Sequence, residues 1–341
     1  MIIFKKHKIP IDKKAIQAFH TDRLLPYERK VLAFVKEWYS ESPTIVVKTS
    51  GTTGKPKEMS FTKGQLVESA RRTISFLGLQ KGEKALLSLS TDYIAGKLML
   101  VRAIVGDLDL YVREPESNPL LSLEEDIDFA AFVPMQVREM LREKVSFERF
   151  RKIRNLIIGG GVLNIQTEKQ LSSLSQNIYH TYGMTETLTH IAMRRIAPKN
   201  QNFYSALPGV SFRQDERACL VIDVPYLYNE AIVSNDIVEL LDEYSFQYIG
   251  RYDNVINSGG VKLFPEEIEK RLADFIAVPY YISSESDERL GQRVVLKIES
   301  NRPVEGLEKL LTERLERYER PKKIYYLSEF ERTKTGKVIR D

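Results

Sequence analysis

Residues 49–57, TSGTTGKPK, combine the groups that a protein uses to hold a phosphate. Their glycines let backbone N–H groups approach an anion closely, and their hydroxyls and lysines add hydrogen-bond donors and positive charge. The segment is not a Walker A loop, because that pattern needs glycine where Thr49 stands and serine or threonine where Pro56 stands. The sequence therefore predicts a phosphate-binding loop of another kind, with a polar surface turn as the alternative.

Two further segments place glycine, aromatic and carboxylate residues after apolar runs. A glycine triplet at 159–161 follows the run NLII, but Asn164 stands where a dinucleotide fingerprint needs its third glycine, so a simple turn is an equal interpretation. The stretch 180–187, HTYGMTET, offers Tyr182 for ring stacking and Glu186 for Mg²⁺, which prefers oxygen ligands. By itself this stretch is more typical of a structural role.

The C-terminal third contains a third group of candidate residues. The carboxylate of Asp236 can accept hydrogen bonds from sugar hydroxyls, and the guanidinium of Arg251 can donate to them. Arg251 opens the stretch RYDNVINSGGVK, which contains a Gly-Gly pair near its end. Lys337 belongs to a TGK segment in a basic tail, and taken alone it predicts only a solvated charge.

The elements around these residues predict an α/β fold. Short apolar runs alternate with helical patterns in the first half of the chain, which indicates a mostly parallel sheet covered by helices. Strands dominate residues 203–249. A helix opened by Pro265, a strand, a second helix and another strand then predict a small α+β unit. We therefore expect a large domain over residues 1–252 and a small one over residues 253–341.

Composition excludes several classes of protein. A chain of 341 residues is long enough for about two domains, and 43% hydrophobic with 29% charged residues excludes wholesale disorder. A net charge of +4 is too weak to indicate a nucleic-acid partner. Cys219 is the single cysteine, so an intramolecular disulfide is excluded. No apolar run reaches the roughly 18 residues of a membrane span, and the N-terminus does not resemble a signal peptide. We expect a cytoplasmic protein of undetermined oligomeric state.

Taken together and in order, these motifs resemble the adenylate-forming superfamily of acyl-CoA ligases, luciferases and peptide-synthetase adenylation domains. The resemblance runs from residue 44 to the end and rests on TSGTTGKPK, YGMTET, SND, GRYDNVINSGGVKLFPEEIE and TGK. It implies a large N-terminal domain of mixed sheets covered by helices and a small mobile C-terminal domain. Only 48 residues precede Thr49, so we expect a shortened N-terminal part.

Carried over residue by residue, the resemblance implies that ATP, Mg²⁺ and CoA bind. The residues matching the pyrophosphate loop are Thr49, Ser50, Gly51, Thr52, Thr53, Gly54 and Lys57. The residues matching the adenine and ribose contacts are Gly159, Gly160, Gly161, Tyr182, Asp236 and Arg251. Those matching the catalytic and mobile parts are Thr185 and Glu186 at the α-phosphate and Mg²⁺, Asp253 at the hinge, Gly259 and Gly260 facing the pantetheine thiol, and Lys337 at the reacting carboxylate.

The compact layout is similar to the o-succinylbenzoate–CoA ligases of menaquinone synthesis, as the stretches LSTDYIAGK and VPMQ also suggest. That acid has two carboxylates, of which one is activated. The other needs a cation, because burying an unpaired charge is costly. We expect Lys97 to pair with the benzoate carboxylate, Thr189 or His190 to lie near the succinyl end, and Tyr93 to line the same pocket.

Four alternatives remain at this point. In the first alternative, Lys97 and Arg102 are surface charges on an amphipathic helix. The substrate is another aryl or a medium-chain acid in the second, and a carrier protein receives the acyl group in the third. The fourth is a nucleotide-binding pseudoenzyme, which the intact set Glu186, Asp236, Arg251 and Lys337 opposes.

Overall fold

The computed structural model describes residues 1–22, 24–48, 58–332 and 338–340. The chain forms two compact units, and each is described by itself. The first unit comprises Met1–Leu163, Gln170–Ser211 and Asp223–Ile232, and the second comprises Asn164–Lys169, Phe212–Ile222 and Val233–Asp341. These divisions differ in position from the functional boundary expected at residue 253, which stays a prediction.

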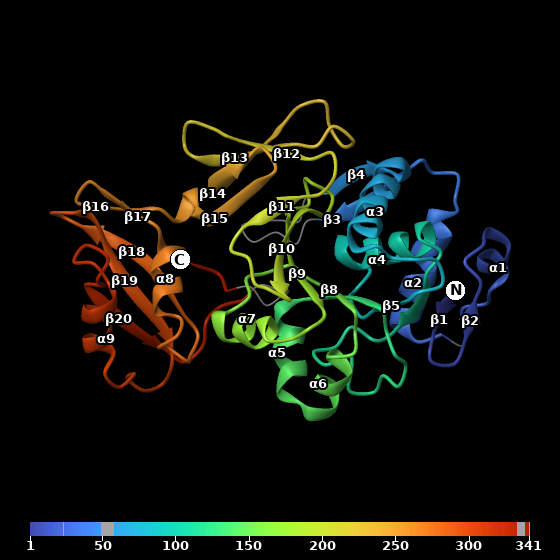
Figure 1. The fold of residues 1–341 in the computed structure, drawn as a ribbon, viewed down its shortest axis with the longest axis horizontal. Helices are drawn as coiled ribbons and strands as arrows, with labels where there is room; N and C mark the ends of the chain where they lie inside the picture. The colour runs from blue at the N-terminus through green and yellow to red at the C-terminus, as the bar shows by residue number, and fades with distance from the viewer. Residues whose placement is uncertain (23, 49–57, 333–337, 341) are drawn as a thin grey trace. The chain divides into compact units, whose positions relative to one another are not determined.

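Figure 1 labels the helices and strands where there is room. The helices are α1 (Lys13–Ala18), α2 (Pro26–Trp38), α3 (Lys63–Leu77), α4 (Ile94–Val105), α5 (Pro134–Arg142), α6 (Lys144–Phe150), α7 (Ile165–Ser172), α8 (Pro265–Leu272) and α9 (Leu307–Arg314), with a 3-10 turn at Tyr252–Asn254. The strands up to the glycine triplet are β1 (Ile2–Ile3), β2 (Lys8–Ile9), β3 (Thr44–Lys48), β4 (Glu58–Thr62), β5 (Lys84–Leu87), β6 (Asp109–Val112), β7 (Phe129–Phe132) and β8 (Asn155–Ile158). The later strands are β9 (Asn177–Gly183), β10 (His190–Ala197), β11 (Tyr204–Ala206), β12 (Ser211–Gln214), β13 (Cys219–Asp223), β14 (Ile232–Asp242), β15 (Ser245–Arg251), β16 (Ile256–Ser258), β17 (Val261–Leu263), β18 (Tyr280–Asp287), β19 (Gly291–Glu299) and β20 (Lys323–Leu327).

A twisted sheet is the centre of the first unit. Within this unit, the strands of the sheet follow the order β11-β10-β9-β8-β7-β5-β6-β1-β2, and the order continues past β11 with β15, β14, β13 and β12. The pairs from β9 to β6 are parallel, whereas β10 runs antiparallel to both β9 and β11. The run NLII of β8 is buried on every residue, as expected for a parallel strand covered on both faces. The predicted parallel sheet is therefore confirmed.

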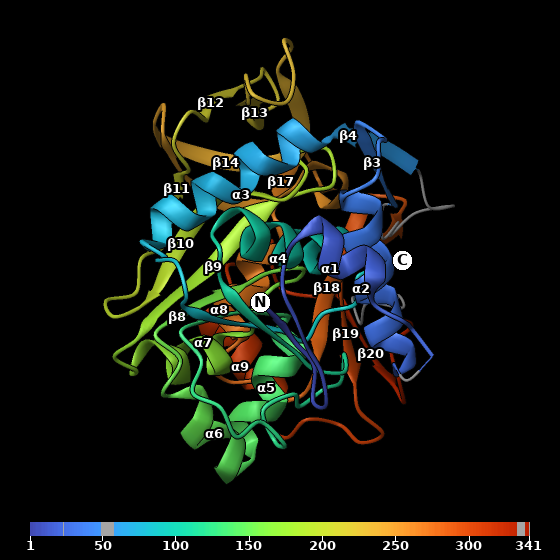
Figure 2. The same cartoon turned by 90° about the vertical axis from the view of Figure 1, so that its right-hand side faces the viewer.

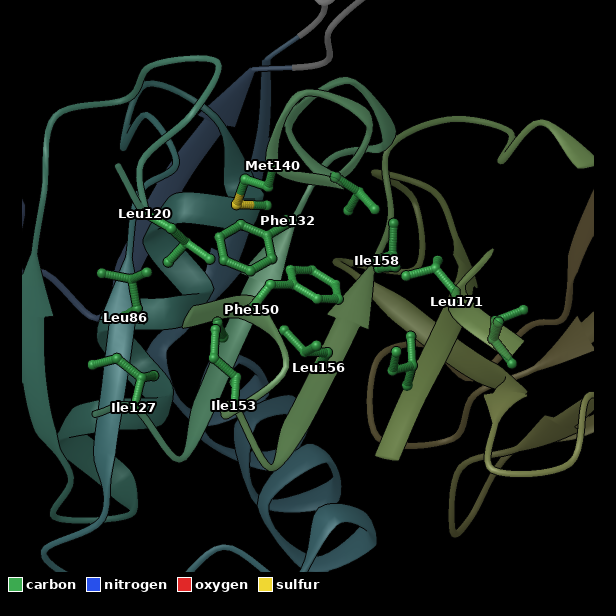
Figure 3. Packing of buried hydrophobic residues seen from close by; sticks show 14 of the residues in the cluster. Leu86, Leu120, Ile127, Phe132, Met140, Phe150, Ile153, Leu156, Ile158 and Leu171 are labelled. Atoms are coloured by element: carbon green, nitrogen blue, oxygen red, sulfur yellow. The ribbon is translucent and has the colours of Figure 1, made fainter. Parts of the chain in front are cut away.

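Alternate residues of the parallel strands fill the core shown in Figure 3. Leu86, Phe132 and Leu156 turn to the face that α5 and α6 cover, where Phe132 stacks on Phe150 with ring centroids 6.2 Å apart. The opposite face meets α4, which packs on β5 and β6 and lies beside α3 (Figure 2). Helices on both faces leave the carboxyl ends of the strands as the edge at which polar side chains gather.

A smaller sheet forms the core of the second unit. Its strands follow the order β17-β16-β19-β18, with β20 parallel to β19. The apolar faces of α8 and α9 cover it around Ile268, Leu296 and Leu311. The two helices and two strands predicted after residue 253 are thus present, and the structure adds β16, β17 and β18. Throughout the described part of the chain, every helix is too short or too polar to span a membrane.

Candidate active site

The predicted phosphate loop joins the strands of a hairpin. β3 and β4 pair antiparallel in a register that sets Lys48 opposite Glu58. Residues 49–57, including every predicted phosphate ligand from Thr49 to Lys57, lie outside the described residues. The sequence predicts a helix after this loop, which is α3, and the structure places the strand β4 before that helix. The hairpin therefore holds the two ends of the segment next to one another.

The glycine triplet at 159–161 follows the carboxyl end of β8. A Cβ on Gly159 would lie 2.3 Å from Thr181 Oγ1, so a side chain does not fit between this residue and β9. Gly160 has a φ of 81°, a conformation that favours glycine. These two constraints explain the glycines physically, and they bring the backbone of the triplet against β9, the strand that carries Tyr182.

The TET residues form a tight turn between β9 and β10. Buried Thr187 organises it: its Oγ1 accepts a hydrogen bond from the backbone N–H of Met184 at 2.9 Å and donates to Thr189 O at 2.7 Å. A Cβ on Gly183 would lie 2.3 Å from Thr189 O, so glycine is required where the turn closes. The turn leaves Glu186 exposed at its tip.

The oxygen atoms of the TET turn fit an Mg²⁺ ion that is bound together with the phosphates of a nucleotide. Glu186 supplies one carboxylate, with the hydroxyl of Thr185 beside it in the sequence. Within the described ranges, no group of three or more His, Cys, Asp or Glu side chains could hold a metal by itself. Mg²⁺ commonly binds one or two carboxylates together with substrate phosphates and water, and a single exposed carboxylate satisfies that requirement.

Asp236 and Arg251 are brought together by the β14–β15 hairpin, whose register sets them opposite each other. Arg251 Nη1 donates to Asp236 Oδ1 at 3.1 Å, and its Nη2 donates to Asp253 Oδ2 at 2.9 Å. Asn235 Nδ2 donates to the same Asp253 carboxylate at 3.2 Å. Arg251 thus joins the predicted ribose carboxylate, which is 7% exposed, to the predicted hinge residue.

Gly259 and Gly260 form the two-residue turn between β16 and β17. Both have positive φ, 60° and 85°, which is the geometry of a tight hairpin turn that glycine accommodates best. Lys337, the predicted catalytic lysine, lies outside the described residues. The described chain resumes at Val338, which pairs with Arg332 across an isolated bridge.

The residues predicted to line the acid pocket start at the N-terminus of α4. Tyr93 is the N-cap residue and is 36% exposed. Lys97 is half-buried, and its Nζ donates to Val46 O at 2.9 Å and lies 5.4 Å from the centre of the Phe34 ring. Its ammonium group is therefore engaged by β3 and α2.

Arg102, on the same helix, is buried to 2% exposure. The alternative that made it a surface charge is therefore wrong. Its Nη1 contacts Met99 Sδ at 3.7 Å, whereas its Nε and Nη2 have no hydrogen-bond partner among the described residues. Burial lowers the pKa of Arg102 to about 9, so the guanidinium still carries its charge at neutral pH. A buried cation without an anion costs several kcal/mol, on the order given by desolvation.

His190 lies near that guanidinium at the start of β10. Its Nε2 is hydrogen-bonded to Thr73 Oγ1 at 2.9 Å, and its Nδ1 lies 3.5 Å from Thr189 Oγ1. Burial, and secondarily the charge of Arg102, lower the pKa of His190 well below its ordinary value. The imidazole is therefore neutral, and it forms with Arg102 a buried group of one cation and neutral hydrogen-bonding side chains.

Tyr204 is a site residue that sequence reasoning missed. Its ring lies 5.7 Å from the ring of Tyr182, and it is 8% exposed. It belongs to none of the recognised motifs, and only the antiparallel pairing of β11 with β10 brings it near β9.

The fold and these motifs define a class of nucleotide-using enzymes, and comparisons with known proteins agree. The model of the AMP-binding enzyme family matches residues 7–221. A solved structure from Dyadobacter fermentans, an acyl-CoA synthetase (AMP-forming)/AMP-acid ligase II-like protein, is 37% identical, with a TM-score of 0.67 over 96% of this chain and 95% of that one. The chain belongs to the AMP-binding enzyme family.

Two more distant relatives share a narrower description. The 2-succinylbenzoate–CoA ligase of Lactococcus lactis is 26% identical over 88% of this chain and 70% of its own length. The o-succinylbenzoate coenzyme A synthetase of Bacillus subtilis, solved with ATP and magnesium ion, is 21% identical with a TM-score of 0.75 over 86% of this chain and 68% of that one. The fold is therefore the α/β fold of adenylate-forming enzymes.

Proposed function

We propose that this protein is an ATP-dependent acid–CoA ligase that activates a dicarboxylic aryl acid, o-succinylbenzoate, for menaquinone synthesis. The observation that carries the choice of acid is the buried Arg102 guanidinium beside neutral His190. An acid with a second carboxylate would supply the anion that this cation lacks among the described residues. The names of the Lactococcus lactis and Bacillus subtilis relatives support the same substrate.

The resemblance to the adenylate-forming superfamily supports the assignment of the nucleotide to the motif residues. Adenine lies between Tyr182 and the backbone of the glycine triplet, which packs against β9. Asp236 accepts hydrogen bonds from the ribose hydroxyls, with Arg251 beside it. Glu186 would hold Mg²⁺, which supplies positive charge at the α-phosphate as negative charge develops there.

The residues of the chain bind and orient the reactants of two successive displacement reactions. In the first, a carboxylate oxygen of the acid bonds to the α-phosphorus of ATP while the bond to pyrophosphate breaks. Thr185 and Lys337 stabilise the charge that accumulates at this centre. In the second, the thiolate of CoA bonds to the acyl carbon and AMP leaves. Gly259 and Gly260 line the path of the pantetheine, and Asp253 is the hinge between the two steps.

The acid site is proposed at α4 and the start of β10. Arg102 pairs with the carboxylate that is not activated, while Thr189 and His190 contact the remainder of the acid. Tyr93 lies at the exposed end of the same helix. Lys97 stays a second candidate for the carboxylate, although its Nζ is already bonded to Val46 O. ATP and CoA, as intracellular co-substrates, support a cytoplasmic location, with small molecules rather than nucleic acid as partners.

Release of pyrophosphate tests the function directly. The protein is incubated with ATP, Mg²⁺ and a panel of acids, with and without CoA, and the products are analysed by mass spectrometry. The proposal expects pyrophosphate with o-succinylbenzoate, together with its CoA thioester when CoA is present. Turnover confined to monocarboxylic acids would retain the ligase and discard the diacid. Acyl-adenylate that transfers only to a phosphopantetheine carrier protein would indicate an adenylation domain, and no pyrophosphate with any acid would contradict the enzyme itself.

A further inference from the structure

Tyr204 contacts both sides of the adenine site proposed above. Its ring centroid lies 5.7 Å from that of Tyr182, with 58° between the ring planes. Its hydroxyl is 2.6 Å from His180 Nδ1, and His180 Nε2 is 2.9 Å from Gly161 O. One side chain thus touches the predicted stacking ring directly and reaches the glycine triplet through one histidine.

The chemistry of the partners determines the direction of these hydrogen bonds. A carbonyl oxygen only accepts, so His180 Nε2 carries a proton and donates it to Gly161 O. In this tautomer, Nδ1 accepts from the hydroxyl of Tyr204. His180 is 9% exposed and Tyr204 is 8% exposed, so this chain of hydrogen bonds is shielded from water. Satisfied buried networks of this kind rigidify the groups that they join.

Strand pairing and a cation also hold Tyr204 in place. β11 runs antiparallel to β10, with Met193 opposite Ser205. The guanidinium of Arg194 lies 5.7 Å from the centre of the Tyr204 ring and donates to Gln201 O at 3.0 Å. The Tyr204 ring therefore contacts Arg194 of β10 as well as the aromatic side chains of β9.

We infer that Tyr204 and His180 are positioning residues for the nucleobase, which hold the Gly161 carbonyl and the Tyr182 ring in a preformed slot for adenine. The inference rests on the proposed function, because that function places adenine between Tyr182 and the triplet. A preformed slot strengthens binding because the walls need not be ordered when the ligand arrives. Loss of the network should therefore weaken ligands that contain adenosine and spare pyrophosphate and the acid.

The test compares Tyr204→Phe, His180→Leu and the double variant with Tyr179→Phe as the matched control. The hydroxyl of Tyr179, also on β9, makes no hydrogen bond to a described residue. Isothermal titration of each protein with ATP, AMP and pyrophosphate, all with Mg²⁺, gives the dissociation constants. Each single variant should raise Kd for ATP and AMP about fivefold, the loss expected for one hydrogen bond, and leave pyrophosphate unchanged. The double variant should lose no more than the worse single variant, because both break one chain of bonds.

Three results would overturn the inference: unchanged Kd for ATP in Tyr204→Phe, equal weakening of ATP and pyrophosphate, or losses that multiply in the double variant. His180→Gln covers the case in which His180→Leu fails to fold, since an amide can accept from Tyr204 and donate to Gly161 O, and its affinity for ATP should approach that of wild type. Binding is measured without an acid, so the inference about the adenine slot can be tested even if the protein has no ligase activity. A protein that binds ATP but turns over no acid would contradict the proposed ligase function alone. A wild-type protein that binds no ATP would contradict both.

Discussion

Replacing Arg102 by methionine should make the protein more stable and, at the same time, a poorer enzyme for a diacid. The guanidinium is 2% exposed, and its Nε and Nη2 lack hydrogen-bond partners among the described residues. Methionine fills much of the same volume without a charge. A side chain that costs stability and is nevertheless present in the core is typical of a binding site.

The size of the effect follows from the same burial. Burial lowers the pKa of Arg102 from its ordinary 12.5 to about 9, which corresponds to about 5 kcal/mol of unfavourable desolvation at 1.36 kcal/mol per pKa unit. Measured replacements of buried charges by apolar residues recover less, about 1–4 kcal/mol. We therefore expect the free energy of unfolding of the first unit to rise by about 3 kcal/mol. A lost charge-assisted hydrogen bond to the substrate should lower kcat/KM for the diacid about 100-fold, since such bonds contribute roughly 1.5–3 kcal/mol.

The assay pairs chemical denaturation with pyrophosphate release for Arg102→Met and, as the matched control, Lys97→Met. Both substitutions remove one positive charge from α4. Arg102→Met should unfold at higher denaturant concentration, keep KM for ATP, and lose turnover of o-succinylbenzoate, while Lys97→Met changes little. A destabilised Arg102→Met protein with unchanged KM for the diacid would refute the reasoning. Loss of diacid affinity in Lys97→Met alone would transfer the role to Lys97.

Three further outcomes can be measured. Gly183→Ala should lower kcat at least tenfold and reduce stability, because its Cβ would lie 2.3 Å from Thr189 O and displace the TET turn; wild-type pyrophosphate release would contradict this. Glu186→Gln should raise the Mg²⁺ concentration needed for half-maximal activity at least about tenfold, and an unchanged requirement would remove Glu186 from the metal. His190 has a lowered pKa in the folded state, so the unfolded state binds more protons below about pH 6.5. The free energy of unfolding should therefore fall as the pH drops from 7 to 5, by up to about 1.4 kcal/mol per unit, and His190→Gln should flatten that dependence.

The family could be identified from the order of the motifs in the sequence. Local geometry explains why these motifs contain the residues that they do. The glycines at 159, 160 and 183 are required by contacts or backbone angles that lie within a few residues or on the adjacent strand. Because these requirements are local, the glycines and the TET residues form motifs that can be found in the sequence alone. The apolar run NLII before the glycine triplet and the helix expected to carry Lys97 and Arg102 likewise correspond to β8 and α4 of the structure.

Other elements had no such signal. β18 has an irregular burial pattern, and β4 directly follows the predicted phosphate loop. Their strand conformation comes from pairing with distant partners, because a strand is stabilised by hydrogen bonds to its neighbours. Tyr204 and His180 are 24 residues apart and meet only through such pairing.

Lys97 and Arg102 also show which features follow from the sequence and which follow only from the tertiary structure. Sequence analysis placed both on one helix and chose Lys97 as the candidate for the substrate carboxylate. Five residues along a helix turn a side chain by roughly 140°, so the two cations point in different directions. The residues from Leu98 to Val101 are buried all round, and an amphipathic pattern therefore gives no indication of which cation faces inward. The sequence determined that α4 carries two positive charges, and only the packing of α4 against the sheet and against α3 decided that Arg102 is the buried one.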